Sequence, residues 1–225
     1  MTVKAVFFDM GGTIDTFWYS KEMRLAETPG LQLLLSSYGL DLRLNDQQLY
    51  DLVTNGIARY HQWRLVSYQE LPASVVWRDY ILAGKSDPYP QLDSIADDLM
   101  VWIETHYYKR KMRPEIPAVL AAIQSMGLKI GIISNVNSRG QVPLNLTQYG
   151  IKHYFNPIIL SSEYKWRKPD PSIFHFAARL ANCPTSECIY IGDRIARDIV
   201  GAKRAGYKLA IQIKHDFKHG ENDDG

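Results

Sequence analysis

The chain has 225 residues, of which 46% are hydrophobic and 22% charged, so it can fold as one large or two small domains and is too apolar to be disordered. Its 26 basic and 24 acidic side chains are interspersed, which excludes the basic surface expected of a nucleic-acid-binding protein. No apolar stretch approaches the roughly 18–20 residues of a membrane span, and no secretory signal pattern is present. We therefore expect a cytoplasmic protein that binds neither nucleic acid nor a membrane.

The first predicted element is a short buried strand over residues 3–8, which ends at Asp9 and is followed by Gly11 and Gly12. From residue 113 onward, helical and strand-like stretches alternate. Further strands are predicted at 129–133, 157–160, 188–191 and 208–213, and the helices between them include 116–126 and 195–205. This alternation predicts an α/β fold with a parallel sheet covered by helices on both faces.

Residues 15–111 interrupt this alternation with several helical patterns. Asn45 and Gln48 have the spacing of a capping box, and apolar residues recur at helical spacing over 49–60 and 92–106. No convincing strand pattern occurs in this stretch. The sequence therefore predicts a discontinuous core, residues 1–14 and 112–225, with a helical domain inserted at residues 15–111.

Polar residues follow the carboxyl end of each of the first four predicted strands. They are Asp9, the pair Ser134 and Asn135, Lys168, and Asp193. Each residue alone has an ordinary structural explanation as a loop, turn, surface or helix-capping residue. In an open parallel sheet, however, these strand ends face one crevice where ligands bind. Their shared placement therefore favours a common site.

These residue types suit phosphoryl transfer, which needs a nucleophile, a divalent cation and hydrogen-bond donors. Asp9 can act as a covalent nucleophile, and Asp9 with Asp193 can hold Mg²⁺ through carboxylate oxygens. Lys168 would offset the negative charge, and the Ser134 hydroxyl would donate to a phosphoryl oxygen. Asp198 has two open interpretations: a second acidic group around the metal, or an acid in the first turn of a helix.

The motifs FFDMGGT (7–13), ISN (133–135), RKPD (167–170) and IGD (191–193), followed by Asp198 and GAKRAG (201–206), resemble the four motifs of the haloacid dehalogenase (HAD) superfamily of hydrolases. The resemblance extends across the whole predicted core. It implies a Rossmann-like core with a helical cap, an aspartyl-phosphate intermediate on Asp9, and Mg²⁺ held by Asp9, Asp193 and the Gly11 carbonyl. The implied function is a phosphatase acting on a small phosphorylated molecule.

The same resemblance implies a set of phosphate-binding residues. These are Gly12, Thr13, Ser134, Asn135 and Lys168. It also implies that Lys168 takes part in catalysis. The sequence singles out no cap residue as a determinant of the substrate.

One position departs from the family's phosphatases, which carry a general acid-base Asp two residues after the nucleophile. This chain has Gly11 there. A backbone carbonyl survives the change, but the loss of a general acid-base group typically lowers a rate by about 10²–10⁴. Asp15 lies nearby, although an acid at its position in relatives serves the cap hinge. His61 and His106 of the cap are the other candidate proton donors.

Two alternatives to a phosphatase stay open. A dehalogenase- or phosphonatase-like enzyme would also lack the acid at Gly11, but dehalogenases need no metal and do not usually carry an acidic pair such as Asp193 and Asp198. A phosphonatase would need a cap lysine for a Schiff base, and Lys21 and Lys85 are available. The second alternative is a non-catalytic phosphate-binding protein.

Overall fold

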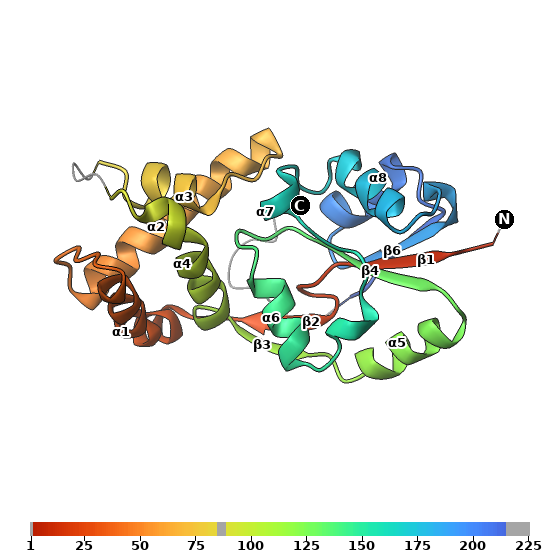
Figure 1. Ribbon diagram of the computed structural model, residues 1–225, viewed down its shortest axis with the longest axis horizontal. Helices are drawn as coiled ribbons and strands as arrows, with labels where there is room; N and C mark the ends of the chain where they lie inside the picture. The colour runs from red at the N-terminus through yellow and green to blue at the C-terminus, as the bar shows by residue number, and fades with distance from the viewer. Residues whose placement is uncertain (1, 85–88, 215–225) are drawn as a thin grey trace.

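The computed structural model describes residues 2–84 and 89–214, and its centre is a five-stranded parallel sheet with the strand order β5-β4-β1-β6-β7 (Figure 1). The strands are β1 (Ala5–Phe8), β4 (Lys129–Ser134), β5 (Ile158–Leu160), β6 (Cys188–Gly192) and β7 (Leu209–Gln212). Every neighbouring pair runs parallel. The α/β fold predicted from the alternating pattern is confirmed.

Helices cover both faces of this sheet. They are α5 (Ile116–Ser125) and α6 (Gln141–Gln148) on one face, and α8 (Pro171–Leu180) and α9 (Val200–Arg204) on the other. Figure 1 places α5 and α8 on opposite sides. Phe7 packs with the layer of α8 and α9, whereas Phe8 packs with the layer of α5 and α6. Strand β1 is central and buried on both faces, which explains its continuous apolar sequence.

Short helical turns link the regular elements. They are the α-helical turn α7 (Ser161–Tyr164), the 3₁₀ turns η2 (Lys152–Tyr154) and η3 (Thr185–Glu187), and the π-helical turns η1 (Val76–Ile81) and η4 (Ile195–Ile199). The single helix expected over 195–205 is therefore divided into η4 and α9. The wider turn η4 directly follows β6, at the edge of the sheet where the predicted site lies.

The segment between β1 and α5 is mainly helical. It contains α1 (Lys21–Ser37), α2 (Asp46–Ser67), α3 (Ala73–Val75) and α4 (Leu92–His106). The predicted capping box is present at the start of α2, where Asn45 and Gln48 each accept a hydrogen bond from the other's backbone N–H. These helices have a hydrophobic core of their own, with Tyr60 and Trp77 fully buried in it. In Figure 1 they lie to the left of the sheet.

The expectation of no strand within residues 15–111 is wrong. Strands β2 (Asp15–Trp18) and β3 (Lys109–Met112) form an antiparallel ribbon that joins the helical segment to the sheet. The sequence of β3 is KRKM, which has no apolar alternation, and its partner lies far away in the chain, so local patterning does not reveal it. The domain division at 14/15 and 111/112 stays a prediction, and the ribbon lies at these positions.

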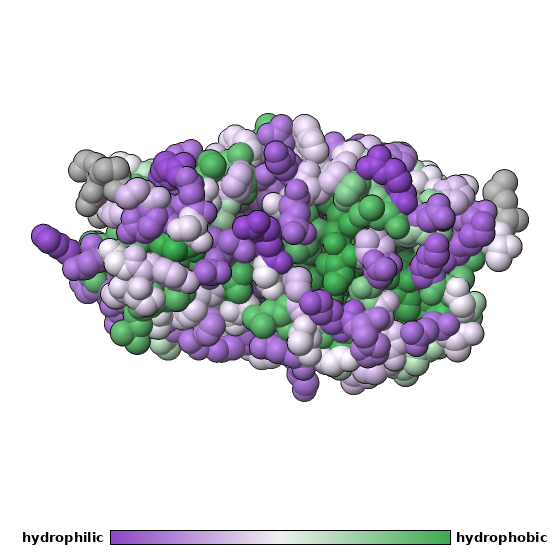
Figure 2. All heavy atoms as spheres, viewed as in Figure 1, coloured by the Kyte–Doolittle hydropathy of each residue, from purple (hydrophilic) through white to green (hydrophobic). Residues whose placement is uncertain are grey.

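The surface on the side shown in Figure 2 is mixed, with polar residues over the helical segment and an apolar area between the helical layers of the core. Among the helices of the described residues, none is long and apolar enough to cross a membrane.

Candidate active site

The structure brings most of the predicted site residues together at the carboxyl edge of the sheet. Asp9, Gly11, Ser134, Asn135 and Lys168 all line one cavity of about 260 Å³. Asp9 follows β1 directly, and Ser134 is the last residue of β4. These strands are neighbours in the sheet, so residues more than a hundred positions apart in sequence face the same space.

Lys168 is the centre of the polar cluster. Its side chain is almost completely buried, and Nζ lies 2.7 Å from Asp9 Oδ1, 2.7 Å from Asp198 Oδ1 and 2.7 Å from the Tyr190 hydroxyl oxygen. An ammonium group has three N–H donors, and these three oxygens match that number. Asn135 positions the lysine, because its side-chain amide accepts from the Lys168 N–H at 2.9 Å and donates to the Lys168 carbonyl at 3.0 Å.

Three buried carboxylates face one another beside this lysine. One carboxylate oxygen from each of Asp9, Asp193 and Asp198 lies within 4.8 Å of the other two. Burial, with the charges of Asp198 and Asp193, raises the pKa of Asp9 to about 7, although Lys168 counteracts this rise. Burial also opposes ionisation of Asp198, yet the charges of Lys168 and Arg197 hold its pKa below its ordinary value. The cluster therefore concentrates negative charge where a cation would be stabilised.

The donor set fits a divalent cation such as Mg²⁺, which prefers carboxylate and carbonyl oxygens. Gly12 contributes to this fit, because a Cβ atom there would lie 2.4 Å from Asp193 Oδ2, and its φ of +85° is one that glycine adopts readily. Asp198 is already engaged by Lys168, by the Tyr190 hydroxyl at 3.2 Å and by the Arg194 N–H at 3.0 Å. Its two oxygens therefore position Lys168 and the loop after β6.

The space beside Gly11 is bounded by Phe17 and Arg110. A Cβ atom on Gly11 would lie 3.2 Å from the ring of Phe17 and 3.6 Å from Arg110 Nη1. Arg110 donates to the buried Asp15 carboxylate at 3.0 Å, and the Tyr149 hydroxyl donates to the same carboxylate at 3.0 Å. Asp15 is therefore held within the β2–β3 ribbon and is not directed at the reaction centre.

Three other candidates from the sequence differ in their placement. Thr13 is fully buried, does not line the cavity, and its hydroxyl has no hydrogen-bond partner in the described part of the chain. His61 lines the cavity, but burial and the charges of Arg64 and Arg167 lower its pKa to about 2, so the imidazole is neutral at pH 7. His106 stacks on Trp102, with ring centroids 4.3 Å apart, and bonds to its own helix.

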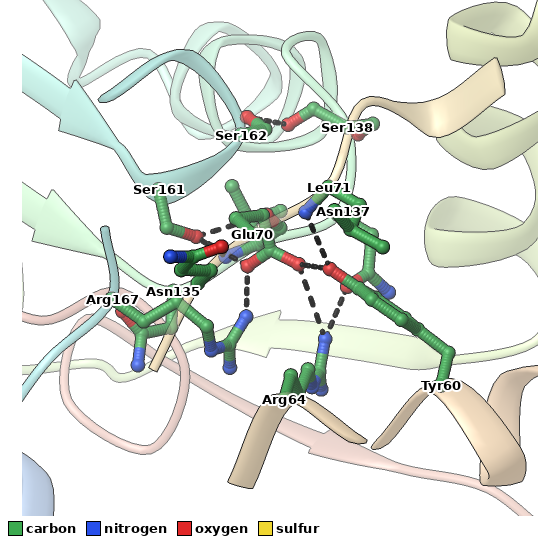
Figure 3. A network of polar contacts seen from close by, with 12 residues as sticks. Tyr60, Arg64, Glu70, Leu71, Asn135, Asn137, Ser138, Ser161, Ser162 and Arg167 are labelled. Carbon is green, nitrogen blue, oxygen red and sulfur yellow. Dashed lines mark hydrogen bonds and ion pairs between the residues drawn. The ribbon is translucent and has the colours of Figure 1, made fainter. Parts of the chain in front are cut away.

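Two buried glutamates connect the helical segment to loops of the core. Glu70 accepts hydrogen bonds from Arg167 and from the Ser161 hydroxyl, and from Tyr60 of α2 (Figure 3). Glu104 on α4 accepts from the Asn137 N–H at 2.9 Å, and from the N–H and hydroxyl of Ser138, in the loop after β4.

Backbone hydrogen bonds strengthen the connection at Glu70. The N–H of Glu70 donates to the Lys165 carbonyl at 2.8 Å, and the N–H of Arg167 donates to the Tyr68 carbonyl at 3.0 Å. The segment paired in this way ends directly before Lys168.

Sequence reasoning did not identify several cationic residues of the cavity. They are Arg64, Arg110, Arg194 and Arg197. Arg194 and Arg197 lie between Asp193 and Asp198, in the loop and turn that follow β6. Their proximity to these two acids in the sequence could have predicted that they lie at the site. The positions of Arg64 and Arg110 relative to the site depend on how the helical segment folds over the sheet.

The sequence and fold of this chain are similar to those of known hydrolases. The model of the haloacid dehalogenase-like hydrolase family matches residues 3–206, so the chain belongs to this family of hydrolases. It is 28% identical to a glyceraldehyde 3-phosphate phosphatase from Methanopyrus kandleri, over 99% of this chain and 90% of that protein.

Two solved structures share the fold. A HAD phosphatase from Thermococcus onnurineus superposes with a TM-score of 0.62 at 21% identity, over 98% of this chain and 90% of that chain. A 2-haloacid dehalogenase from Pseudomonas syringae pv. tomato gives a TM-score of 0.60 at 19% identity, over 99% of this chain and 91% of that chain. The fold is therefore shared by phosphatases and dehalogenases, and the chemistry must be inferred from the site.

Proposed function

We propose that the protein is a Mg²⁺-dependent phosphatase that acts on a small phosphorylated molecule through an aspartyl-phosphate on Asp9. The observation that carries the proposal is the cluster in which Lys168 contacts Asp9 while Asp193 and Asp198 lie within 4.8 Å of Asp9. A buried carboxylate at the end of the central strand, beside a fixed ammonium group and an acidic pair, suits phosphoryl transfer. The similarity to a named phosphatase over 99% of the chain also supports it.

The proposed reaction has two steps at Asp9. A carboxylate oxygen of Asp9 attacks phosphorus, and the bond from phosphorus to the ester oxygen breaks as the alcohol leaves. Water then attacks the acyl phosphate, which releases inorganic phosphate and restores the carboxylate. The Ser134 hydroxyl, at the cavity, would donate to a phosphoryl oxygen, and the positive charge of Lys168 would offset the negative charge of the bound phosphate. Gly12 and Asn135 shape the loops around them.

The metal would be held by the carboxylates of Asp9 and Asp193 and by the carbonyl of Gly11. Bound Mg²⁺ supplies positive charge that offsets the repulsion between the nucleophile and the phosphate. Asp198 would not bind the metal directly in this scheme, because its oxygens are engaged by Lys168, Tyr190 and the backbone N–H of Arg194.

Gly11 limits the substrate in this proposal. Without an acid at this position, the departing oxygen receives its proton from water or from the substrate itself. Acyl, enol or aryl phosphates, whose leaving groups are stable as anions, are therefore favoured. The guanidinium of Arg110 lies 3.6 Å from the position that a Cβ atom on residue 11 would occupy. It lines the cavity and would stabilise negative charge on the leaving oxygen electrostatically.

The alternatives have less support. A phosphonatase would need a cap lysine at the reaction centre, but Lys21 is exposed and does not line the cavity that contains Asp9, while Lys85 lies outside the described residues. A dehalogenase would not need the acidic pair. A non-catalytic phosphate-binding protein accounts for Gly11, but it does not require a carboxylate nucleophile in contact with a buried lysine.

The deciding experiment is a screen of aryl, acyl and alkyl phosphates and phosphonates, with Mg²⁺ and with EDTA, on the wild type and on Asp9→Asn. We expect turnover of activated phosphates that depends on Mg²⁺ and is lost in Asp9→Asn. Turnover that persists in Asp9→Asn would exclude the covalent mechanism. Metal-independent turnover would favour dehalogenase-type chemistry, and no turnover of any ester would favour the binding protein.

A further inference from the structure

A second cavity, of about 320 Å³, adjoins the one that contains Asp9. The two cavities share five lining residues: His61, Arg64, Lys168, Arg194 and Arg197. Lys168 contacts Asp9 and lines both spaces, so the second cavity begins within one side-chain length of the nucleophile. A small molecule that reacts at Asp9 can therefore extend into it.

The lining of the second cavity is strongly cationic. Five of its residues are Arg64, Arg167, Lys168, Arg194 and Arg197, and within the described ranges no aspartate or glutamate lines it. The whole chain carries a net charge of only +2, so this concentration is local. Burial is the largest cause of the low pKa of His61, about 2, and the charges of Arg64 and Arg167 lower it further.

The partners of these cations show which charge is available to a ligand. Arg167 bonds to the buried Glu70, Arg64 lies 3.6 Å from the same carboxylate, and Lys168 is paired with Asp9 and Asp198. Arg197 differs, because it acts on Asp9 and Asp198 only through its charge. The structure records no hydrogen bond or ion pair for its guanidinium across residues 2–84 and 89–214, and its Nε is buried.

A buried N–H donor without a partner is costly, and a guanidinium is well suited to bind carboxylate or phosphate oxygens in a bidentate manner. Arg197 lies on η4, in the segment between Asp193 and Asp198, and lines both cavities. It is therefore placed to contact a substrate held at Asp9, and Arg64 and His61 close the cavity from the side of α2.

We propose that the second cavity is a subsite for a second anionic group, so that the substrate is a small molecule with a phosphate at one end and a carboxylate or a second phosphate at the other. This inference rests on the proposed phosphatase function, because it assumes that a phosphate occupies the space beside Asp9. Arg197 is the residue that recognises the distal anion.

Binding of non-hydrolysable ligands tests the subsite without requiring turnover. Titration calorimetry in Mg²⁺ would compare 3-phosphonopropionate, its neutral amide and propane-1,3-bisphosphonate, on the wild type, Arg197→Gln, Arg197→Lys and Arg204→Gln. The last variant removes one positive charge from an exposed position on α9 that lines neither cavity. The carboxylate and bisphosphonate arms distinguish the two kinds of distal anion.

We expect the wild type to bind at least one doubly anionic ligand about tenfold or more tightly than the amide, in line with a charge-assisted bidentate contact. Arg197→Gln should reduce this ratio about tenfold, Arg197→Lys should retain part of it, and Arg204→Gln should leave it unchanged. Equal binding of all three ligands by the wild type would overturn the inference. An equal loss for the amide and the anionic ligands in Arg197→Gln would overturn it too, because it would place Arg197 at the phosphate.

The binding test of the subsite and the turnover test of the proposed phosphatase can fail independently. Turnover of phosphate esters with an unchanged ligand ratio would leave the phosphatase in place and remove the subsite. A preference for the doubly anionic ligands without turnover of any ester would retain the subsite and remove the phosphatase.

Discussion

Asp9 illustrates how the protein environment changes the pKa of a side chain from its value in water. Burial and the neighbouring acids raise its pKa from an ordinary 3.8 to about 7 in the metal-free protein. Between these two values the folded chain holds a proton that the unfolded chain has released. The contribution of Asp9 to stability is therefore fully present below about pH 4 and is lost as the pH rises toward 7.

The variant Asp9→Asn tests this sign, because asparagine resembles the neutral acid and Lys168 keeps Asp198 as its carboxylate partner. In EDTA at pH 7.5 it should raise Tm by several degrees, at about 2–4 °C per kcal/mol for a chain of this length, and the gain should shrink toward pH 4.5. Thermal unfolding at both pH values measures the effect. The exposed Asp79→Asn is the control and should show no such gain. A lower Tm for Asp9→Asn at pH 7.5 would contradict the reasoning.

Gly11 provides a second test at the residue scale. Its backbone is outside the left-handed region, so Gly11→Asp introduces an acid without backbone strain, although the side chain must fit beside Phe17 and Arg110. We expect it to raise kcat/KM for alkyl phosphates by about tenfold or more and to change aryl phosphates little, because only poor leaving groups need the proton. Gly11→Asn has the same size without the acid. An equal gain in both variants would show that proton donation is not the cause.

At the scale of elements, the residues around Glu70 connect the helical segment between β1 and α5 to the loop that carries Lys168. One buried carboxylate receives Arg167 and Ser161 from the core and Tyr60 from α2, and Arg64 lies 3.6 Å away (Figure 3). Glu104 holds the loop after β4 in the same way, and burial raises its pKa. Both glutamates come from the helical segment between β1 and α5, so its folding and the order of the two core loops are coupled.

Glu70→Gln should therefore destabilise the protein strongly. Removing one partner of a buried ion pair leaves a buried charge without compensation, which typically costs about 3–5 kcal/mol. Ser161→Ala removes one hydrogen bond to the same carboxylate and two with the backbone of Val136, but it leaves no buried charge, so it should cost less, about 1–3 kcal/mol. Urea unfolding of both variants gives the comparison. Equal stabilities for Glu70→Gln and the wild type would show that the network is not stabilising.

At the scale of the whole molecule, the site lies between the helical segment and the parallel sheet, which have separate hydrophobic cores. The helical segment has its own hydrophobic core, and the sheet has one core on each face. The β2–β3 ribbon joins the two parts, with Asp15, Arg110 and Tyr149 bonded together in and beside it. The carboxylates that would hold a metal follow strands of the parallel sheet, whereas Arg64 comes from α2 and Arg110 from β3.

Metal binding should therefore be visible in the stability of the whole chain. Mg²⁺ at 100 times its Kd would stabilise the folded state by about 2.7 kcal/mol, which corresponds to a rise of about 5–10 °C in Tm. Scanning calorimetry with and without EDTA measures this shift. Asp193→Asn should abolish most of it, whereas Asp79→Asn should retain it. A shift of the same size in Asp193→Asn would place the metal elsewhere.

The sequence alone determined the α/β fold, the order of the core elements and the convergence of Asp9, Ser134, Lys168 and Asp193. These follow from local hydrophobic periodicity and from the rule that parallel strands present their carboxyl ends at one edge. The β2–β3 ribbon, the Glu70 network, the fixed position of Asp15 and the cationic second cavity were decided only by the tertiary structure. Each depends on contacts between segments far apart in the chain, and such contacts leave no periodic signal along it.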